Sequence, residues 1–367
     1  MLSDYASPAK DETKDSANKL LLATLLRSLG DGGLANLEAT LAAHCDPHGV
    51  WEMFHPFNRC ETLASAIENF WRRLFTALPD LEVRPAVLLA GVYEGREQVS
   101  MWGHVLGTFD QPLLTIPPTH GLVTMRIGIN AIVEGDVFKK VYVLLDLVDL
   151  MRQAGFYPLR AMPGSTEAWA FPPAGSGTDT CRVDAARGAR SLQIIHEMQM
   201  GLPKPDEIPH LENRPSRHSH HWHPHMNWYG PAGIGSMRGQ RGFRDFHGAL
   251  FLQAFPDRRG FPRSEGGAED APGHYVRLGD GNFAVTGGWP SLVGTHLGPE
   301  WLGLPPTGRQ IEMRVADWYR LDDEGRIADN WVMMDVPHIL EQMGLDVFHD
   351  LEFAVDRSRE RWPITKK

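Results

Sequence analysis

The sequence lacks several features that would place it in a specialised class of protein. It has only three cysteines (Cys45, Cys60 and Cys181), too few for a disulfide scaffold, and this usage suits a reducing compartment. It has no uninterrupted apolar run of about 18 residues, so we expect no transmembrane helix and no membrane partner. Its start also lacks the basic-then-apolar layout of a signal peptide. We therefore expect a cytoplasmic protein.

The sequence also has fewer basic residues than acidic residues. The formal net charge is −10 at pH 7, which argues against nucleic acid as a partner because binding phosphates requires a basic face. The glycine-rich string GPAGIGSMRG precedes a helix, but it lacks the P-loop Lys-Ser/Thr pair and the parallel βαβ setting of a phosphate site. A G-x-S-x-G nucleophile elbow is also missing.

What the chain does contain is an internal repeat. Residues 107–156 and 294–345 share Gly-Thr, then Pro-Pro-Thr, then two apolar runs, an Asp, and a short helix ending in Gln-x-x-Gly. Upstream, Trp51 corresponds to Trp228. A repeat this long indicates two copies of one domain and not a solenoid, and 367 residues are enough for two domains of ordinary size.

Each copy shows helix-like periodicity first and strand-like runs later, which predicts the α+β class. Paired glycines at 32–33 are expected to break the first helical run. A second-copy helix is expected over 191–200 and its first strand over 226–229. The predicted organisation is a mobile tail over 1–17, a first domain over 18–157, a Pro/Gly/Ser-rich linker over 158–190, a second domain over 191–350 and a C-terminal tail over 351–367.

The second copy resembles the SnoaL-like polyketide cyclase family. The resemblance rests on NWYGPAGIG at the first strand, an amphipathic helix ending in Phe-Pro-Asp, then GTH, PPTGR and a terminal W-x-x-x-D. It implies the nuclear-transport-factor-2-like fold, a cone of helices closed by a bent sheet. It also implies acid/base catalysis without metal or organic cofactor, with an Asp at the W-x-x-x-D position. That position is Asp335 here and Asp146 in the first copy, where the resemblance is weaker.

Asp335 is therefore the first candidate catalytic residue. Strand alternation places Trp331, Met333 and Asp335 on one face, and a carboxylate inside an apolar cone would have the raised pKa of a useful base. The alternative is that Asp335 caps the helix that follows, since Asp before Val-Pro is a good N-terminal cap. Both roles can hold together.

His296, in GTH, is the second catalytic candidate, because a histidine on the sheet can donate to an oxyanion or relay a proton. Its alternative role is to fix the turn. The first copy has Phe109 at this position, which can neither donate a hydrogen bond to an oxyanion nor relay a proton. Arg309, in PPTGR, is a candidate for an anionic substrate group, with a surface ion pair as the alternative.

The remaining candidates for substrate binding are aromatic. Trp289, Tyr319 and Trp331 are predicted to lie on the sheet, where packing is the default role and lining the cone the alternative. His247, on the long second-copy helix, is expected to be a half-buried hydrogen-bonding residue and not a catalyst.

The tract HSHHWHPH, from His218 to His225, departs from the family pattern. His221, His223 and His225 alternate and could share one face of an extended chain, which makes them an alternative zinc site. Alternating ligands on a flat ribbon do not converge, and no fourth ligand is identifiable. The first copy repeats the motif as H-x-D-P-H over 44–48, so a structural role is the competing interpretation.

Three functions remain in competition. The first is a cyclase, isomerase or lyase that removes a proton next to a carbonyl in the second cone, with the first copy retained as an intramolecular pseudo-dimer partner. The second is a non-catalytic small-molecule-binding protein, because the fold alone does not give activity. The third is a metal-dependent enzyme that uses the histidine tract. Further homo-oligomerisation is left open.

Overall fold

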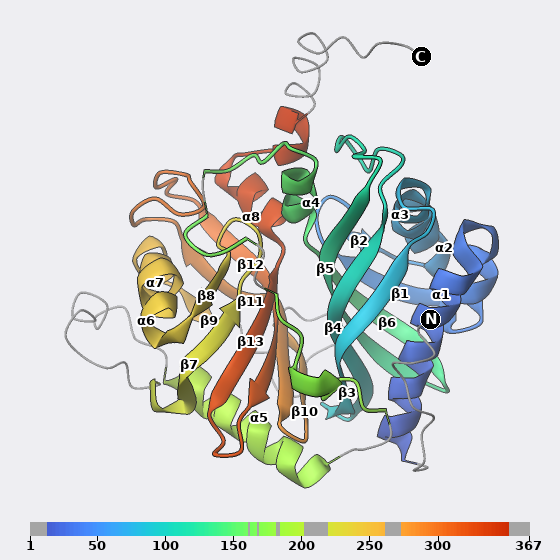
Figure 1. Ribbon diagram of the computed structural model, residues 1–367, viewed down its shortest axis with the longest axis horizontal. Helices are drawn as coiled ribbons and strands as arrows, with labels where there is room; N and C mark the ends of the chain where they lie inside the picture. The colour runs from blue at the N-terminus through green and yellow to red at the C-terminus, as the bar shows by residue number, and fades with distance from the viewer. Residues whose placement is uncertain are drawn as a thin grey trace.

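The computed structural model describes residues 13–160, 162–166, 169–180, 184–201, 219–260 and 273–351. The terminal tails expected from the sequence lie largely outside these residues. His218 and Cys181 also lie outside them. Figure 1 shows two domains, each with helices on one side of a curved sheet, so the predicted α+β fold class is confirmed. Within the described residues, no helix is long and apolar enough to cross a membrane.

The first domain has a six-stranded sheet in the order β2-β1-β6-β5-β4-β3, where only β1 and β6 run parallel. Its strands are β1 (Cys45–Met53), β2 (Arg59–Cys60), β3 (Glu82–Tyr93), β4 (Arg96–Thr108), β5 (Leu122–Glu134) and β6 (Val137–Leu145). Its helices are α1 (Lys14–Ala42), α2 (Leu63–Ala66), α3 (Arg72–Ala77) and α4 (Leu147–Gln153), with a π-helical segment (Ile67–Trp71) between α2 and α3.

The second domain repeats this order in the sheet β10-β11-β12-β13-β7-β8, with β7 and β13 parallel and β9 beside β11. Its strands are β7 (Trp222–Tyr229), β8 (Ser236–Arg238), β9 (Arg259–Gly260), β10 (His274–Asp280), β11 (Phe283–Thr295), β12 (Gln310–Leu321) and β13 (Ile327–Met334). Its helices are α5 (Ala185–Met200), α6 (Gly239–Phe243), α7 (Ala249–Ala254) and α8 (Val336–Met343), with a π-helical segment (Arg244–Gly248) between α6 and α7.

The repeated Pro-Asp and Gly-Thr motifs are bonded to each other in both domains. Asp80 accepts from the backbone N–H of Thr108 at 2.6 Å and from its hydroxyl at 2.8 Å. Asp257 accepts the same two bonds from Thr295, both at 2.7 Å. A carboxylate that receives two bonds ties the end of the long helix to the end of a central strand. These motifs therefore maintain the fold.

Some elements begin earlier than the sequence pattern predicts. α5 starts at Ala185, because Asp184 accepts a hydrogen bond from the N–H of Arg187 and so caps the helix. β7 starts at Trp222, where pairing with Ile327 of β13 begins. α1 is continuous in outline, but Gly33 has φ 54° and ψ −160°, which produces the break expected at the paired glycines.

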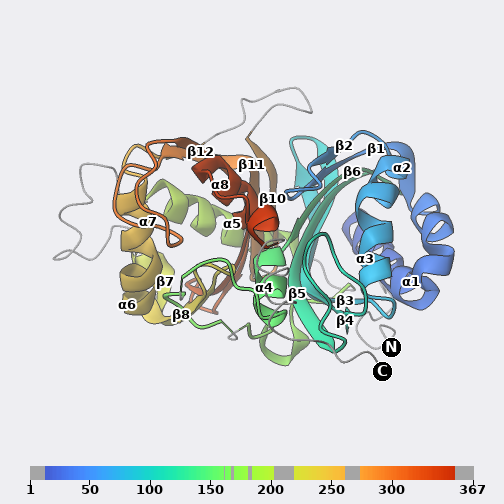
Figure 2. The ribbon, with the colours of Figure 1, turned by 90° about the horizontal axis from the view of Figure 1, so that it is seen from above.

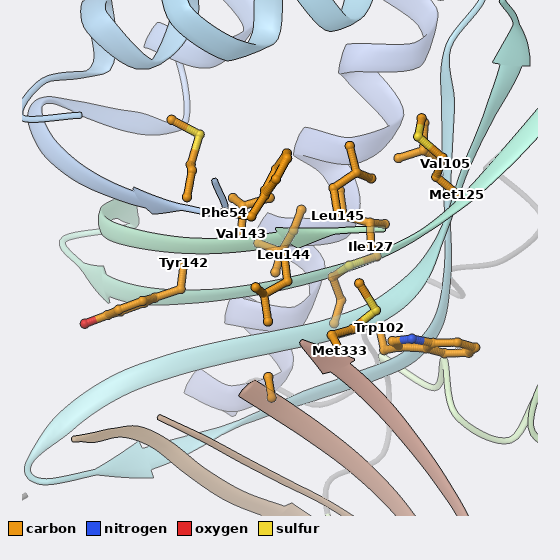
Figure 3. Packing of buried hydrophobic residues seen from close by; sticks show 14 of the residues in the cluster. Phe54, Trp102, Val105, Met125, Ile127, Tyr142, Val143, Leu144, Leu145 and Met333 are labelled. Carbon is orange, nitrogen blue, oxygen red and sulfur yellow. The ribbon is translucent and has the colours of Figure 1, made fainter. Parts of the chain in front are cut away.

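The two sheets pack against each other, and the helices α1–α3 and α5–α7 cover their outer faces (Figure 2). The indole N–H of Trp318 donates to the Ser100 hydroxyl across this interface at 2.8 Å. Figure 3 shows Trp102 beside Met333 at the same contact. Gly128 leaves room for Trp318, since a Cβ at this position would lie 2.4 Å from the indole ring.

Candidate active site

A buried polar cluster lies on the helix-covered face of the second sheet. Strand alternation separates this face from the one that carries Trp318 and meets the first domain. Asp317 of β12 accepts a hydrogen bond from the Asn330 amide of β13 at 3.4 Å. Beside it, Gln199 of α5 donates to the Thr286 hydroxyl of β11 at 2.9 Å, and the register pairs Thr286 directly with Asp317.

Asp317 has the chemistry of a general base. Burial raises its pKa to about 7, although hydrogen bonds from Asn330 and Tyr319 oppose the rise. The residue nevertheless keeps an intermediate solvent exposure. A carboxyl with a pKa near neutrality suits proton exchange with a small molecule.

Two histidines face the same interior from other elements. The imidazole of His247, in the π-helical segment, stacks on Trp228 with ring centroids 4.2 Å apart. His296 follows β11 and is fully buried against Phe255, with centroids 5.4 Å apart. Burial lowers the pKa of both, that of His247 to about 3, so both are neutral at pH 7.

Each of these histidines has an enclosed nitrogen with no hydrogen-bond partner among the described residues, Nδ1 in His247 and Nε2 in His296. The other nitrogen of His296 faces the Thr307 hydroxyl at 3.4 Å, and a hydrogen bond from the imidazole to the backbone of Pro299 opposes the effect of burial on its pKa. Leaving a buried polar atom unpaired costs about 1–3 kcal/mol. Unpaired atoms of this kind are rare in folded proteins and call for an explanation.

The first domain has apolar side chains at every equivalent position. Asp146 and Asp335 cap equivalent helices, so they serve as the starting point for aligning the residues of the two domains. From there the pairing of the strands in each sheet gives the equivalent of every residue. The equivalents are Ile129 for Asp317, Ala131 for Tyr319, Val141 for Asn330, Met101 for Thr286, Phe70 for His247 and Phe109 for His296. One cone is therefore an apolar core, whereas the other contains a set of titratable and hydrogen-bonding groups.

Asp335 lies at the interface between the domains. It shares a face with Trp331, as alternation predicts, but this face packs on the first domain. Its Oδ1 accepts from the N–H of His338 at 3.3 Å and so caps α8. Its Oδ2 accepts from Arg314 at 3.1 Å and from the N–H of His55 in the first domain at 2.9 Å. Both oxygens thus have protein donors, and burial raises the pKa of the carboxyl.

The predicted substrate-binding aromatics divide between the two faces. Trp331 packs on Trp102 at 5.3 Å, and its N–H donates to the carbonyl of Ala170 at 2.9 Å. Trp289 lies 5.8 Å from the ring of Tyr142 in the first domain. These two side chains contribute to the domain contact. Tyr319 is fully enclosed in the polar cluster, where burial raises its pKa well above the usual value.

Arg309 lies outside the cone. Its side chain is exposed and donates to the backbone carbonyl of Gln342 at 3.2 Å. This bond ties the end of α8 to the start of β12, so the guanidinium supports a surface connection. The structure does not bring it to Asp317.

The histidine tract forms a turn and the start of β7. The N–H of His225 donates to Nδ1 of His223 at 3.0 Å. The first domain makes the same bond between the N–H of His48 and Asp46 at 2.7 Å. A side chain that accepts from the backbone two residues ahead closes a local turn, which explains the repeated motif. No group of three potential metal ligands occurs among the described residues.

Asp317 is not among the candidates predicted above, although its sequence carries a signal. In RVADWYRL, Asp317 alternates out of phase with Trp318 and stands opposite Ile129 of the first copy. Comparing the two copies for polar-against-apolar differences would have found it.

Comparison with known proteins supports the resemblance seen in the sequence. Residues 290–343 match the family model of the SnoaL-like polyketide cyclases. A search of curated proteins gives no match.

Solved structures similar to this chain each span roughly two fifths of it. A putative SnoaL-like polyketide cyclase from a Jannaschia species is 19% identical, with 41% of this chain and 99% of that chain covered and a TM-score of 0.34. The putative hydroxylase AclR from Streptomyces galilaeus is 14% identical, with 38% and 95% covered and a TM-score of 0.32. The putative polyketide cyclase IdmH from Streptomyces antibioticus is 23% identical, with 41% and 98% covered and a TM-score of 0.28.

Proposed function

We propose that this protein is a SnoaL-like acid/base enzyme of the cyclase, isomerase or lyase type, and that its second domain removes a proton from a carbon next to a carbonyl. The observation that carries the proposal is Asp317, a partly exposed residue in the polar cluster whose carboxyl pKa burial raises to about 7. We assign the base to Asp317 and not to Asp335, because both oxygens of Asp335 are occupied by protein donors.

In this mechanism the ionised Asp317 takes the proton and becomes a carboxylic acid, and the substrate becomes an enolate. The enolate then attacks within the molecule, isomerises or expels a leaving group, and Asp317 can return the proton. His296 is the proposed partner for the enolate oxygen, because it is neutral and has an unpaired nitrogen. The first cone lacks both groups and contributes the contact surface.

The test is hydrogen–deuterium exchange at carbon. Aryl methyl ketones and 2-tetralone would be incubated with the protein in D2O, and loss of the α-proton signal followed by NMR. Asp317→Asn should lower the accelerated exchange by about 10²-fold or more, and His296→Phe by about 10²-fold, the effect of one positioned acid/base group.

Asp146→Asn, in the first domain, is the matched control and should exchange at the unaltered rate per folded molecule. Equal exchange by Asp317→Asn and the unaltered protein would remove Asp317 as the base. Loss of exchange in a folded Asp335→Asn variant would return the role to the W-x-x-x-D aspartate.

A further inference from the structure

His247 is held in an aromatic stack inside the second cone. Trp228 covers one face of the imidazole at 4.2 Å and 20°, and Phe251 lies at 5.7 Å and 25°. Phe243 meets the ring edge-on at 5.5 Å. Together these rings fix the orientation of the imidazole, and the residue retains only 8% exposure.

Packing alone does not require a histidine at this position. The equivalent residue in the first domain is Phe70, which occupies the same place in its own π-helical segment and is fully buried. The fold therefore accepts an apolar ring there. With His247, an enclosed Nδ1 remains without a partner among the described residues, which destabilises the folded state. π-Helical segments also occur frequently at functional sites.

Two intermediate residues connect the ring of His247 to Asp317. Trp228, which stacks on His247, pairs in register with Asn330 of β13, and Asn330 donates to Asp317 of β12. Two strand spacings of about 4.8 Å each separate β7 from β12. His247 lies one ring stack beyond Trp228 of β7, so a ligand that contacts both side chains must be longer than about 10 Å.

We propose that His247 donates a hydrogen bond to an oxygen atom of the substrate, at a position separate from the carbon that Asp317 deprotonates, and so determines which oxygenated substrates the cone accepts. This inference rests on the proposed function. The donating atom in this proposal is Nδ1, which has no acceptor among the described residues and gains one when a substrate oxygen lies beside it. Because burial lowers the pKa of His247 to about 3, the imidazole donates as a neutral group.

The test compares two probes that differ by one oxygen atom, 2-naphthol and naphthalene. Their dissociation constants would be measured by tryptophan fluorescence for the unaltered chain, His247→Phe and Asp317→Asn. We expect the unaltered chain to prefer 2-naphthol by about 10-fold, roughly the effect of one net hydrogen bond. His247→Phe should bind both probes alike, and Asp317→Asn should keep the preference. Thermal unfolding controls for folding, and the Phe variant copies a side chain that the first domain already accommodates.

The other outcomes separate the two proposals. If His247→Phe keeps the preference, or if the unaltered chain binds neither probe, His247 does not have this role. If the preference is lost only in Asp317→Asn, the oxygen lies at Asp317, so the proposed function survives and the assignment of His247 fails. If Asp317→Asn also leaves ketone exchange unchanged, the proposed function fails independently of the binding result.

Discussion

The carboxylate of Asp335 in the second domain accepts a hydrogen bond from the backbone N–H of His55 in the first, at 2.9 Å. The reciprocal bond runs from the N–H of Ala232 to Asp146, at 3.0 Å. Arg314 and Arg126 each hold the aspartate of their own domain. Such a contact uses the same surface on both sides, as in a two-fold symmetric dimer, although here a single chain supplies both halves.

These bonds lead to a prediction for stability. Asp335→Asn should destabilise the protein by about 1–3 kcal/mol, because it removes the charge that accepts hydrogen bonds from the half-buried Arg314 and from the N–H of His55. Thermal or urea unfolding measures this change, and Asp146→Asn should have a similar effect. Exchange activity per folded molecule should be retained in both variants. A folded Asp335→Asn variant with unaltered stability would show that the contact contributes little.

The pH dependence of stability should report on Asp317. The folded protein holds its proton up to about pH 7, whereas the unfolded chain releases it near the ordinary value of 3.8. The stabilisation from this site is therefore complete below about pH 4 and is lost as the pH rises through 7, a change of about 4 kcal/mol. The free energy of unfolding of Asp317→Asn minus that of the unaltered protein should therefore be larger at pH 8 than at pH 4. Parallel stability curves would contradict the raised pKa.

The rate of ketone exchange should depend on pH in the opposite sense. Only the ionised carboxylate takes a proton, so the rate should rise with pH and level off above the pKa of about 7. The measurement is the rate at substrate concentrations well below saturation, from about pH 5 to 9. The absence of an inflection in this range would exclude Asp317 as the base.

The close approach at Gly128 predicts a sensitive position at the interface. Gly128→Ala would place a methyl group 2.4 Å from the ring of Trp318, and such overpacking costs about 1–3 kcal/mol. Differential scanning calorimetry should show a lower melting temperature. Gly135→Ala is unsuitable as a control because φ is 57° there, whereas Gly121→Ala meets nothing within 4 Å and should be nearly neutral.

The histidine tract should not bind a structural metal. Elemental analysis of purified protein should find less than one zinc per chain, and a chelator should leave the melting temperature unchanged. His223→Asp, which copies Asp46 of the first domain, should preserve the turn. Stoichiometric zinc that disappears in His223→Ala would overturn this expectation.

Local patterns were sufficient to predict much of the fold. Helical periodicity, the paired glycines and the repeated Gly-Thr and Pro-Pro-Thr strings predict two α+β copies, and Asp-Val-Pro predicts the cap at Asp335. The site was harder to predict, because alternation shows which residues share a face but not what that face meets. Helices cover one face of each sheet and the partner domain covers the other. Trp331 and Val332 are therefore both buried, although they point to opposite sides.

The placement of Asp317 shows the same difficulty. A single Asp in an otherwise apolar strand usually indicates a solvent-facing position, and sequence alone does not reveal that α5 covers this side. The bond between Gln199 and Thr286 places that helix over the cluster, and it joins elements almost ninety residues apart in the chain. Such long-range packing leaves no periodic signal.

The reciprocal bonds that Asp335 and Asp146 each accept from the other domain also have a genetic consequence. In a dimer of identical chains, every substitution appears in both copies, so a polar residue added to one cavity is added to the other. Here the two halves are encoded separately and remain tethered at any dilution. The two halves are therefore free to differ at equivalent positions, as they do at Phe70 and His247.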